Sequence, residues 1–579
     1  MLRIFNLLII FTFMFSGCAT NTVQNARSGL PDGQQTALKK TGVEKALELP
    51  AVELDKDLLF QLLRADFAVK SGHYTSAVND YLALAQQTRD PRLAATATRV
   101  AIFARKNEQI LAGAKLWAEL DEENVEARQA LVVGYIRKGD SDEALKHLEA
   151  LFNLEHGELD KKFMMVAALL SREKDIQTAL QAMKQFVELR KKQPEAAYAY
   201  AHLAIRAGSL DTALAAIKHA LELRPDWSIA MLMNARILQM QNKPEDALAY
   251  MKGMVRRYPE YLNLRLSYAR LLIDTKQIEK AIPHYEAVLK KTPDNVEVVF
   301  TMGLLNLQLD RLDLAENYLK RAQKLGKGSV EVHYYLGQLE ELRKNYKAAI
   351  DHYSAVGRSE NYMESRVRIA VITAQLGDLA GAREQLNSLR SEAHVDQARL
   401  YLIEGEILRD AKLNEDALQV YNEAIVVFPD NIRLRYSRST VAEKLDKIDI
   451  VEKDLRHILK LESDNVDALN SLGYTLADRT DRYQEAYALI KRAYEINPND
   501  NAIIDSMGWV LYRLGKYQEA IEYLKRSLEM KADPEVAAHL GEVLWVMGQQ
   551  QEAREVWEQA IKQSPEDRFL LNVMKKFGQ

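Results

Sequence analysis

Apolar and small residues recur along the chain in pairs of helix-length segments separated by short polar turns. The pattern is clearest where the small residue Gly405 is followed at fixed intervals by Ala417, Tyr421, Ala424 and Pro429. Two other segments repeat these intervals, with Gly541, Ala553, Trp557, Ala560 and Pro565, and with Ala201, Ala213, Ile217, Ala220 and Pro225. A spacing of about 34 residues between equivalent positions predicts a helix–turn–helix unit that is repeated along the chain.

The small residue of each first helix, here called the anchor, can be followed through nearly the whole sequence. Successive anchors are about 33 to 35 residues apart, and they are Ala65, Thr98, Val132, Ala167, Ala201, Ala235, Ala269, Gly303, Gly337, Ala370, Gly405, Ser439, Gly473, Gly508 and Gly541. One unit cannot bury its own apolar face, so neighbouring units must stack. The sequence therefore predicts an all-α superhelical solenoid of about 15 units within residues 53–567, closed by a capping helix at 568–579.

The packing and the turns follow from the same frame. Small residues at the anchor and twelve positions later let two helix backbones approach to about 8–10 Å. Two units have Ile110 and Val451 where alanine is expected, and we expect irregular units or a kink there. A glycine seven residues after the anchor permits the left-handed turn that ends a helix. Six units have it, at Gly72, Gly139, Gly208, Gly377, Gly515 and Gly548.

These intervals resemble the tetratricopeptide repeat, in which the first helix of each unit lines a concave groove. In that family, positions one and four residues after the anchor point into the groove. Aromatic anchors with charged neighbours suit a peptide or a partner helix. The resemblance predicts a groove formed by Tyr474, Asp505, Trp509, Tyr512, Arg513, Glu542 and Trp545. The alternative is that these aromatic side chains pack between neighbouring repeats, as we expect for Trp117 and Trp557 on second helices.

Composition argues against catalysis and against nucleic-acid binding. The 78 Lys and Arg residues against 82 Asp and Glu leave a net charge of -4, so no general basic field attracts nucleic acid. The 11 histidines form no HExxH motif and no metal-ligand spacing, and no nucleophile has a partner set. Gly326–Ser329 lacks the strand that precedes a phosphate loop, and we expect an inter-helix turn. We therefore expect no enzyme, no cofactor and no metal.

The N-terminus has the pattern of a secretory signal, with Arg3, a short apolar run and small residues before Cys18. The sequence Phe15–Cys18 resembles the bacterial lipobox, in which the cysteine becomes the lipidated first residue of the mature protein. The resemblance implies a signal peptide at residues 1–17 and a lipid anchor on Cys18. Ala19 then points to the outer membrane, with the protein facing the periplasm. Residues 18–52 are polar and aperiodic, and we expect a flexible tether.

The C-terminal units have a more specific likeness, in the segments Asn470–Arg479, Asp505–Tyr512 and Ala537–Trp545. Together with the lipobox, they resemble a family of outer-membrane lipoproteins that partner carboxyl-terminal processing proteases. The resemblance implies an adaptor that binds the periplasmic protease, promotes its activity and helps bring in cell-wall hydrolases as substrates. Two other functions stay open: an assembly factor for an envelope machine such as a pilus or polysaccharide exporter, and a protein that binds glycan strands.

Overall fold

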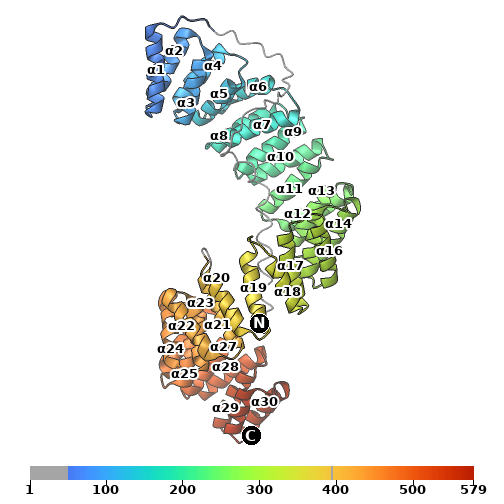
Figure 1. The fold of residues 1–579 in the computed structure, drawn as a ribbon, viewed down its shortest axis with the longest axis vertical. Helices are drawn as coiled ribbons and strands as arrows, with labels where there is room; N and C mark the ends of the chain where they lie inside the picture. Colours follow the sequence, from blue (N-terminus) through green and yellow to red (C-terminus); the bar gives the residue numbers. More distant parts are fainter. Residues whose placement is uncertain (1–49, 393–395, 579) are drawn as a thin grey trace. The chain divides into compact units, whose positions relative to one another are not determined.

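A computed structural model describes residues 50–392 and 396–578. Within these ranges the chain forms 31 α-helices and no strand, so the predicted all-α fold is confirmed (Figure 1). The predicted signal peptide, Cys18 and nearly all of the predicted tether lie outside the described residues. None of the helices in the described ranges has the length and apolar character needed to cross a bilayer.

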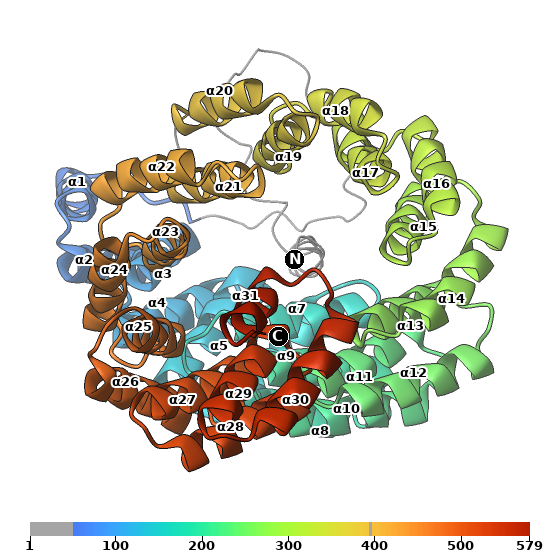
Figure 2. The same ribbon diagram turned by 90° about the horizontal axis from the view of Figure 1, so that it is seen from below.

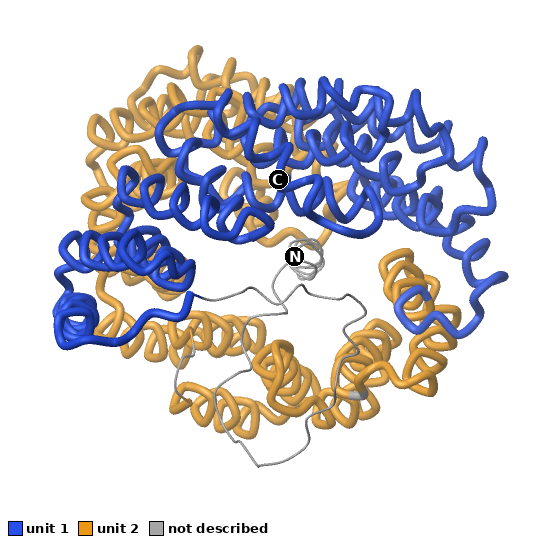
Figure 3. Tube along the Cα trace, turned by 90° about the horizontal axis from the view of Figure 1, so that it is seen from above, with its two compact units in different colours: residues 1–298 blue, residues 299–579 orange. Residues whose placement is uncertain are grey.

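The chain divides into two compact units, residues 1–298 and 299–579 (Figure 3). The helices that begin in the first unit are α1 (Lys56–Lys70), α2 (Tyr74–Thr88), α3 (Pro91–Phe103), α4 (Asn107–Leu120), α5 (Val125–Lys138), α6 (Ser141–Leu154), α7 (Leu159–Ser171), α8 (Ile176–Glu188), α9 (Pro194–Arg206), α10 (Leu210–Leu223), α11 (Ser228–Met240), α12 (Pro244–Arg257), α13 (Leu262–Asp274), α14 (Ile278–Lys291) and α15 (Val296–Gln308), which continues into the second unit.

The second unit continues with the same alternation. Its helices are α16 (Leu312–Lys324), α17 (Ser329–Leu342), α18 (Tyr346–Ser354), α19 (Tyr362–Gln375), α20 (Leu379–Arg390), α21 (Gln397–Asp410), α22 (Asn414–Val427), α23 (Ile432–Lys444), α24 (Ile448–Leu461), α25 (Val466–Arg479), α26 (Tyr483–Ile496), α27 (Asn501–Arg513), α28 (Tyr517–Met530), α29 (Pro534–Val546), α30 (Gln550–Gln563) and α31 (Arg568–Lys576). Residues 325–328 join α16 to α17, as expected of an inter-helix turn.

Every predicted anchor lies on an odd-numbered helix, and the helix that follows it completes the pair. The first thirty helices therefore form the repeats, and α31 lies against α29 and α30 with Leu570 and Val573 buried. Within α7–α14 of the first unit and α17–α26 of the second, odd-numbered helices line the inner side of the curve and even-numbered helices the outer side (Figure 2). We call the odd-numbered helices inner helices and the even-numbered ones outer helices.

At the glycine anchors, a large side chain of the outer helix packs directly on the backbone of the inner helix. A Cβ added to Gly337 would lie 2.7 Å from the ring of Tyr353, and one added to Gly508 would lie 2.5 Å from Leu524. At Gly541 the ring of Trp557 occupies this space in the same way. The pairing of a small and a large residue sixteen positions apart therefore sets the distance between the helices of a pair.

The two units with a weak sequence match form regular helix pairs, α3–α4 and α23–α24. In the first of them the sizes are exchanged. The larger anchor Thr98 faces Gly113, where an added Cβ would lie 2.6 Å from the Thr98 hydroxyl oxygen, and Ile110 is fully buried. Both units therefore have regular helices, and in α3–α4 the larger anchor is accommodated by the absence of a side chain at Gly113.

The turns confirm the predicted left-handed residues. The six glycines placed seven residues after an anchor have φ between 73° and 96°. Other residues adopt the same conformation at the equivalent position in seven further units: Arg105, Asn242, Lys276, Asp310, Lys344, Lys412 and Asp446. The frame therefore fixes the backbone conformation of this turn even where the residue is not glycine, at a cost in conformational energy.

Candidate functional site

The seven predicted groove residues lie on three successive inner helices, α25, α27 and α29, all within the second unit. Their exposure differs. Asp505, Trp509 and Glu542 are buried, whereas Tyr474, Tyr512, Arg513 and Trp545 are half-buried and keep part of their surface accessible. The accessible residues therefore form the edge of the site, and the buried ones lie beneath it.

The centre of the site is a stack of Trp509 on His539. The two rings are 4.1 Å apart and nearly parallel, with an angle of 24° between their planes. His539 is almost fully buried, and its Nδ1 lies 3.0 and 3.2 Å from the two carboxylate oxygens of Asp505. The Trp509 ring thus packs between α27 and α29. Its indole Nε1 is buried and has no hydrogen-bond partner.

Burial and charge act in opposite directions on the pKa of His539. Burial of the ring lowers its pKa, because a charged imidazolium loses solvation. The Asp505 carboxylate raises it by charge and by its hydrogen bond, with further contributions from Glu535 and Asp478, and the net effect is a pKa above the ordinary value. Compared with a free imidazole, the folded site therefore favours the protonated form of His539, which is paired with Asp505.

Tyr474 on α25 contacts α29, two inner helices further along the chain. Its hydroxyl group donates a hydrogen bond to Glu535 Oε1 at 3.0 Å and lies 3.5 Å from His539 Nε2. Burial, followed by the charges of Glu535, Asp478 and Asp505, raises the pKa of Tyr474 well above its usual range. The phenol therefore stays protonated and connects α25 directly to α29.

A second set of contacts joins α27, α29 and the final helix. Tyr512 donates a hydrogen bond to Glu542 Oε1 at 3.1 Å, and Lys576 Nζ on α31 donates to the same oxygen at 2.9 Å. Burial and the Glu542 carboxylate raise the pKa of Tyr512. Because α31 supplies the cation, it completes the polar network of the last repeat in addition to covering apolar side chains.

The remaining two predicted residues, Arg513 and Trp545, make further contacts between helices. Arg513 Nη2 donates a hydrogen bond to the hydroxyl of Tyr483 at 2.7 Å, and Arg513 Nη1 donates to the carbonyl oxygen of Asp478 at 3.3 Å. The Trp545 ring lies 5.7 Å from that of Trp557 and 5.8 Å from that of Phe577. Both residues thus connect neighbouring helices while part of their surface stays accessible.

The sequence pattern did not indicate several members of this site. His539 and Glu535 precede the anchor Gly541 by two and six residues, and Asp478 follows Gly473 by five residues. Glu443 on α23 belongs to the same region, because burial raises its pKa and Glu535 and Asp478 raise it further, against Arg479. The inner side of α23–α29 therefore carries a concentration of carboxylates around its aromatic residues.

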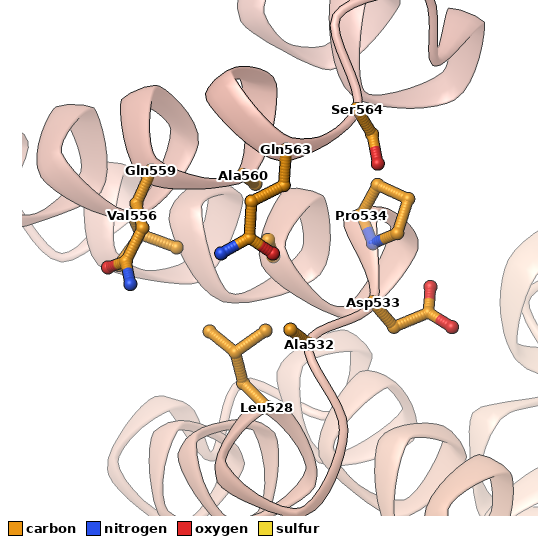
Figure 4. A pocket seen from close by; sticks show the side chains of 10 residues that line it. Leu528, Ala532, Asp533, Pro534, Val556, Gln559, Ala560, Gln563 and Ser564 are labelled. Carbon is orange, nitrogen blue, oxygen red and sulfur yellow. The ribbon is translucent and has the colours of Figure 1, made fainter.

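A separate small cavity lies between α28, the start of α29 and α30, lined among others by Leu528, Pro534, Val556 and Ala560 (Figure 4). Its volume of about 100 Å³ is well below the ~300–1,000 Å³ of typical ligand pockets. In the described ranges, no group of three or more His, Cys, Asp or Glu side chains is arranged to hold a metal ion. The inner surface of α23–α29, with its aromatic side chains and carboxylates, suits a macromolecule.

Family models of the tetratricopeptide repeat match residues 194–226, 238–283, 300–362, 369–432, 464–533 and 506–568. The TPR repeat-containing protein PA4667 of Pseudomonas aeruginosa is 38% identical over 538 residues, which cover 92% of this chain and 90% of that protein. The chain therefore belongs to the tetratricopeptide-repeat proteins. Repeats of this family indicate a scaffold for protein–protein interaction.

More distant similarities cover less than half of this chain. The human protein O-mannosyl-transferase TMTC1 is 22% identical over 215 residues, which cover 36% of this chain and 24% of that enzyme. A tetratricopeptide repeat protein of Parabacteroides merdae, known from a crystal structure, is 19% identical. The match covers 43% of this chain and 98% of that one, with a TM-score of 0.32.

Proposed function

We propose that this chain is a lipid-anchored adaptor that binds and promotes a periplasmic carboxyl-terminal processing protease acting on cell-wall hydrolases. The lipobox resemblance at Cys18 and the likeness of the three C-terminal segments to the lipoprotein partners of such proteases support this proposal. The membership of the chain in a family of interaction scaffolds agrees with a role in which the chain itself performs no chemistry.

The observation that carries the proposal is the combination of side chains on the inner side of α23–α29. Tyr474, Tyr512 and Trp545 have accessible edges, and aromatic residues of this kind often dominate the binding energy of interfaces. Glu535 is exposed beside them. Because the aromatic side chains are held by hydrogen bonds and ring contacts, a partner meets a surface that is already ordered, which reduces the entropy cost of binding.

The mechanism of such an adaptor is co-localisation. A protein held at the membrane by a lipid anchor and a tether brings protease and substrate onto one scaffold. The second binding event then becomes intramolecular, with an effective concentration of up to about millimolar for short flexible links. Faster cleavage follows from this concentration and needs no catalytic group from the scaffold.

The experiment is a pull-down from envelope extract with residues 19–579 as bait. The variant Asp478→Lys/Glu535→Lys reverses two charges on the inner surface. Its matched control, Glu522→Lys/Glu529→Lys, makes the same charge change at exposed positions of the outer helix α28. We expect the unmodified bait and the control to retain the protease and to speed its cleavage of a cell-wall hydrolase, and we expect the inner-surface variant to lose both.

Other outcomes would replace the proposal. Recovery of pilus or exporter components without a protease would favour the assembly-factor function. Sedimentation of the bait with purified cell wall, without a protein partner, would favour glycan binding. If the inner-surface variant and the α28 control lost protease binding to the same extent, this surface would have no specific role, even if the unmodified bait retained a protease.

A further inference from the structure

The first inner helix, α1, exposes a continuous row of large apolar side chains. The row consists of Leu59, Phe60, Leu63 and Phe67, and the two phenylalanines keep 64% and 66% of their surface accessible. Spacings of three and four residues place all four side chains on one face of the helix. Single exposed apolar side chains are common on soluble proteins, whereas a contiguous group marks a surface that binds another molecule or a membrane.

The same face of α29 packs against the inner helix before it. Leu63 lies two residues before the anchor Ala65, just as His539 lies two residues before Gly541. His539 stacks on Trp509 of the preceding inner helix, α27. Among the described residues no helix precedes α1, which packs against α2 at the start of the first unit (Figure 1). The row on α1 is therefore a stacking face that no described repeat covers.

The last repeat is closed by α31, which lies against α29 and α30 and buries Leu570 and Val573. A terminal repeat needs a polar outer face if water is to cover it. The outer face of α1 has phenylalanines and leucines instead, so it suits contact with an apolar surface.

The charged side chains around the row favour an anionic partner. Lys56 and Lys70 lie about one helical turn beyond its two ends, and both are exposed. Neither lysine forms an ion pair with another described residue. The two acids of α1, Asp57 and Asp66, lie to the sides of the row, and Asp66 accepts a hydrogen bond from the hydroxyl of Tyr81 on α2. The face thus combines an apolar centre with a positive charge at each end.

A phospholipid bilayer combines an apolar interior with charged headgroups. Helices that lie in its surface insert Phe and Leu side chains and place Lys side chains among the headgroups. With 15 residues, α1 is shorter than the ~20 residues needed to span a bilayer. We propose that α1 docks on the surface of a membrane that contains anionic phospholipid, with Phe60 and Phe67 among the acyl chains and Lys56 and Lys70 at the headgroups.

The place of α1 in the chain agrees with this partner. It is the first described helix after Cys18, and the expected tether between them spans on the order of 30 Å. The inference therefore rests on the proposed lipid anchor, which holds this end of the chain near a bilayer. It adds to that anchor a contact made by the folded repeats themselves.

A second copy of the chain is a less suitable partner, because the face is small. A helix of 15 residues is about 22 Å long and about 10 Å wide, so one face covers on the order of 200 Å². A stable protein interface buries about 800 Å² on each partner. The row is thus too small to hold a dimer by itself, whereas a few inserted side chains add usefully to a lipid anchor.

The test is co-sedimentation of residues 19–579, without lipid, with vesicles of three parts phosphatidylcholine and one part phosphatidylglycerol. The variant Phe60→Gln/Phe67→Gln removes the two largest side chains of the row. Its matched control, Leu342→Gln/Leu376→Gln, replaces two exposed apolar residues of the second unit. We expect the unmodified chain to bind the vesicles, the phenylalanine variant to bind at least about tenfold more weakly, and the control to change by less than about twofold.

The contribution of the charges is measured separately. We expect Lys56→Glu/Lys70→Glu to weaken binding to these vesicles about tenfold and to have little effect with phosphatidylcholine alone, because the lysines interact with the anionic headgroups. The matched control, Lys218→Glu/Lys252→Glu, makes the same charge change at exposed positions of α10 and α12 and should bind as the unmodified chain does.

Four outcomes would overturn the proposal. The first two are an unmodified chain that does not sediment with the vesicles, and equal weakening in the phenylalanine variant and its control. Self-association that is lost in the phenylalanine variant would assign the face to a second copy. Vesicle binding that is gained only when residues 19–49 are removed would assign it to that segment. Because the test involves neither the lipid on Cys18 nor a protease, its failure is distinguishable from a failure of the pull-down.

Discussion

The inner faces of the two units share one frame and differ in side-chain chemistry. On α7–α13 half of the positions one and five residues after the anchor carry an exposed arginine, and one carries Asp274. On α25–α29 most of the same positions carry aromatic residues and carboxylates, including Tyr474 and Glu542, which take part in hydrogen bonds between helices. The anchor and its large partner hold each repeat together, so these neighbouring positions are free to differ and to determine what binds.

The strongest way to break this comparison is to damage the packing of one unit alone. A Cβ at Gly541 would come within 3.0 Å of the Trp557 ring, which is fully buried and packs against Trp545 and Phe577. Because the ring has little room to shift, we expect Gly541→Ala to destabilise α29–α30 by about 1–3 kcal/mol. Segment-resolved hydrogen exchange of the full chain measures this loss.

The control is Gly253→Ala on α12, where the added Cβ has no neighbour within 4 Å. Alanine has a higher helix propensity than glycine, so this variant should stabilise its helix by about 0.5–1 kcal/mol. Gly541→Ala should leave the protection of α7–α13 unchanged. Loss of protection in both units would show that their inner faces are not independent.

The period of the sequence was enough to predict all fifteen helix pairs and most of their turns. Each anchor must be small and each turn must be left-handed, and both requirements are visible in residue types such as Gly405 and Gly515. The binding surface could be predicted from the sequence only in part. Whether Trp509 faces a groove or packs between repeats depends on His539, which comes from the next repeat and lies beneath it in the stack.

A histidine in each unit gives a pH test with opposite signs. The pKa of His539 is raised from 6.5, so protonation favours the folded state. Its stabilising contribution is fully present below pH 6.5 and is lost as the pH rises through the folded-state pKa. The pKa of His202 is lowered from 6.5, so its neutral form is favoured and stability is lost as the pH falls through the folded-state pKa.

Nuclear magnetic resonance of the protein with 13C-labelled histidine measures both titrations directly. The signals are assigned with His539→Gln and His202→Gln, each of which removes one of them. We expect the midpoint of His539 above pH 6.5 and that of His202 below it. If the order of the two midpoints were reversed, the Asp505 carboxylate would not raise the pKa of His539 as described.

The smallest expected effect concerns the turns, which separate the contribution of the backbone from that of packing. Lys412 joins α21 to α22 with φ 62°, the conformation that Gly515 adopts between α27 and α28 with φ 76°. Lys412→Gly removes a strain of about 1–2 kcal/mol but raises the entropy of the unfolded chain by about 0.5–1 kcal/mol. We therefore expect a net stabilisation of about 0.5 kcal/mol, measured by hydrogen exchange of α21–α22.

The reverse change, Gly515→Ala, introduces a Cβ with no neighbour within 4 Å, so any loss of stability is due to the backbone alone. A neutral result for both variants would mean that the stacking of the repeats, and not the turn residue, determines the conformation of this position.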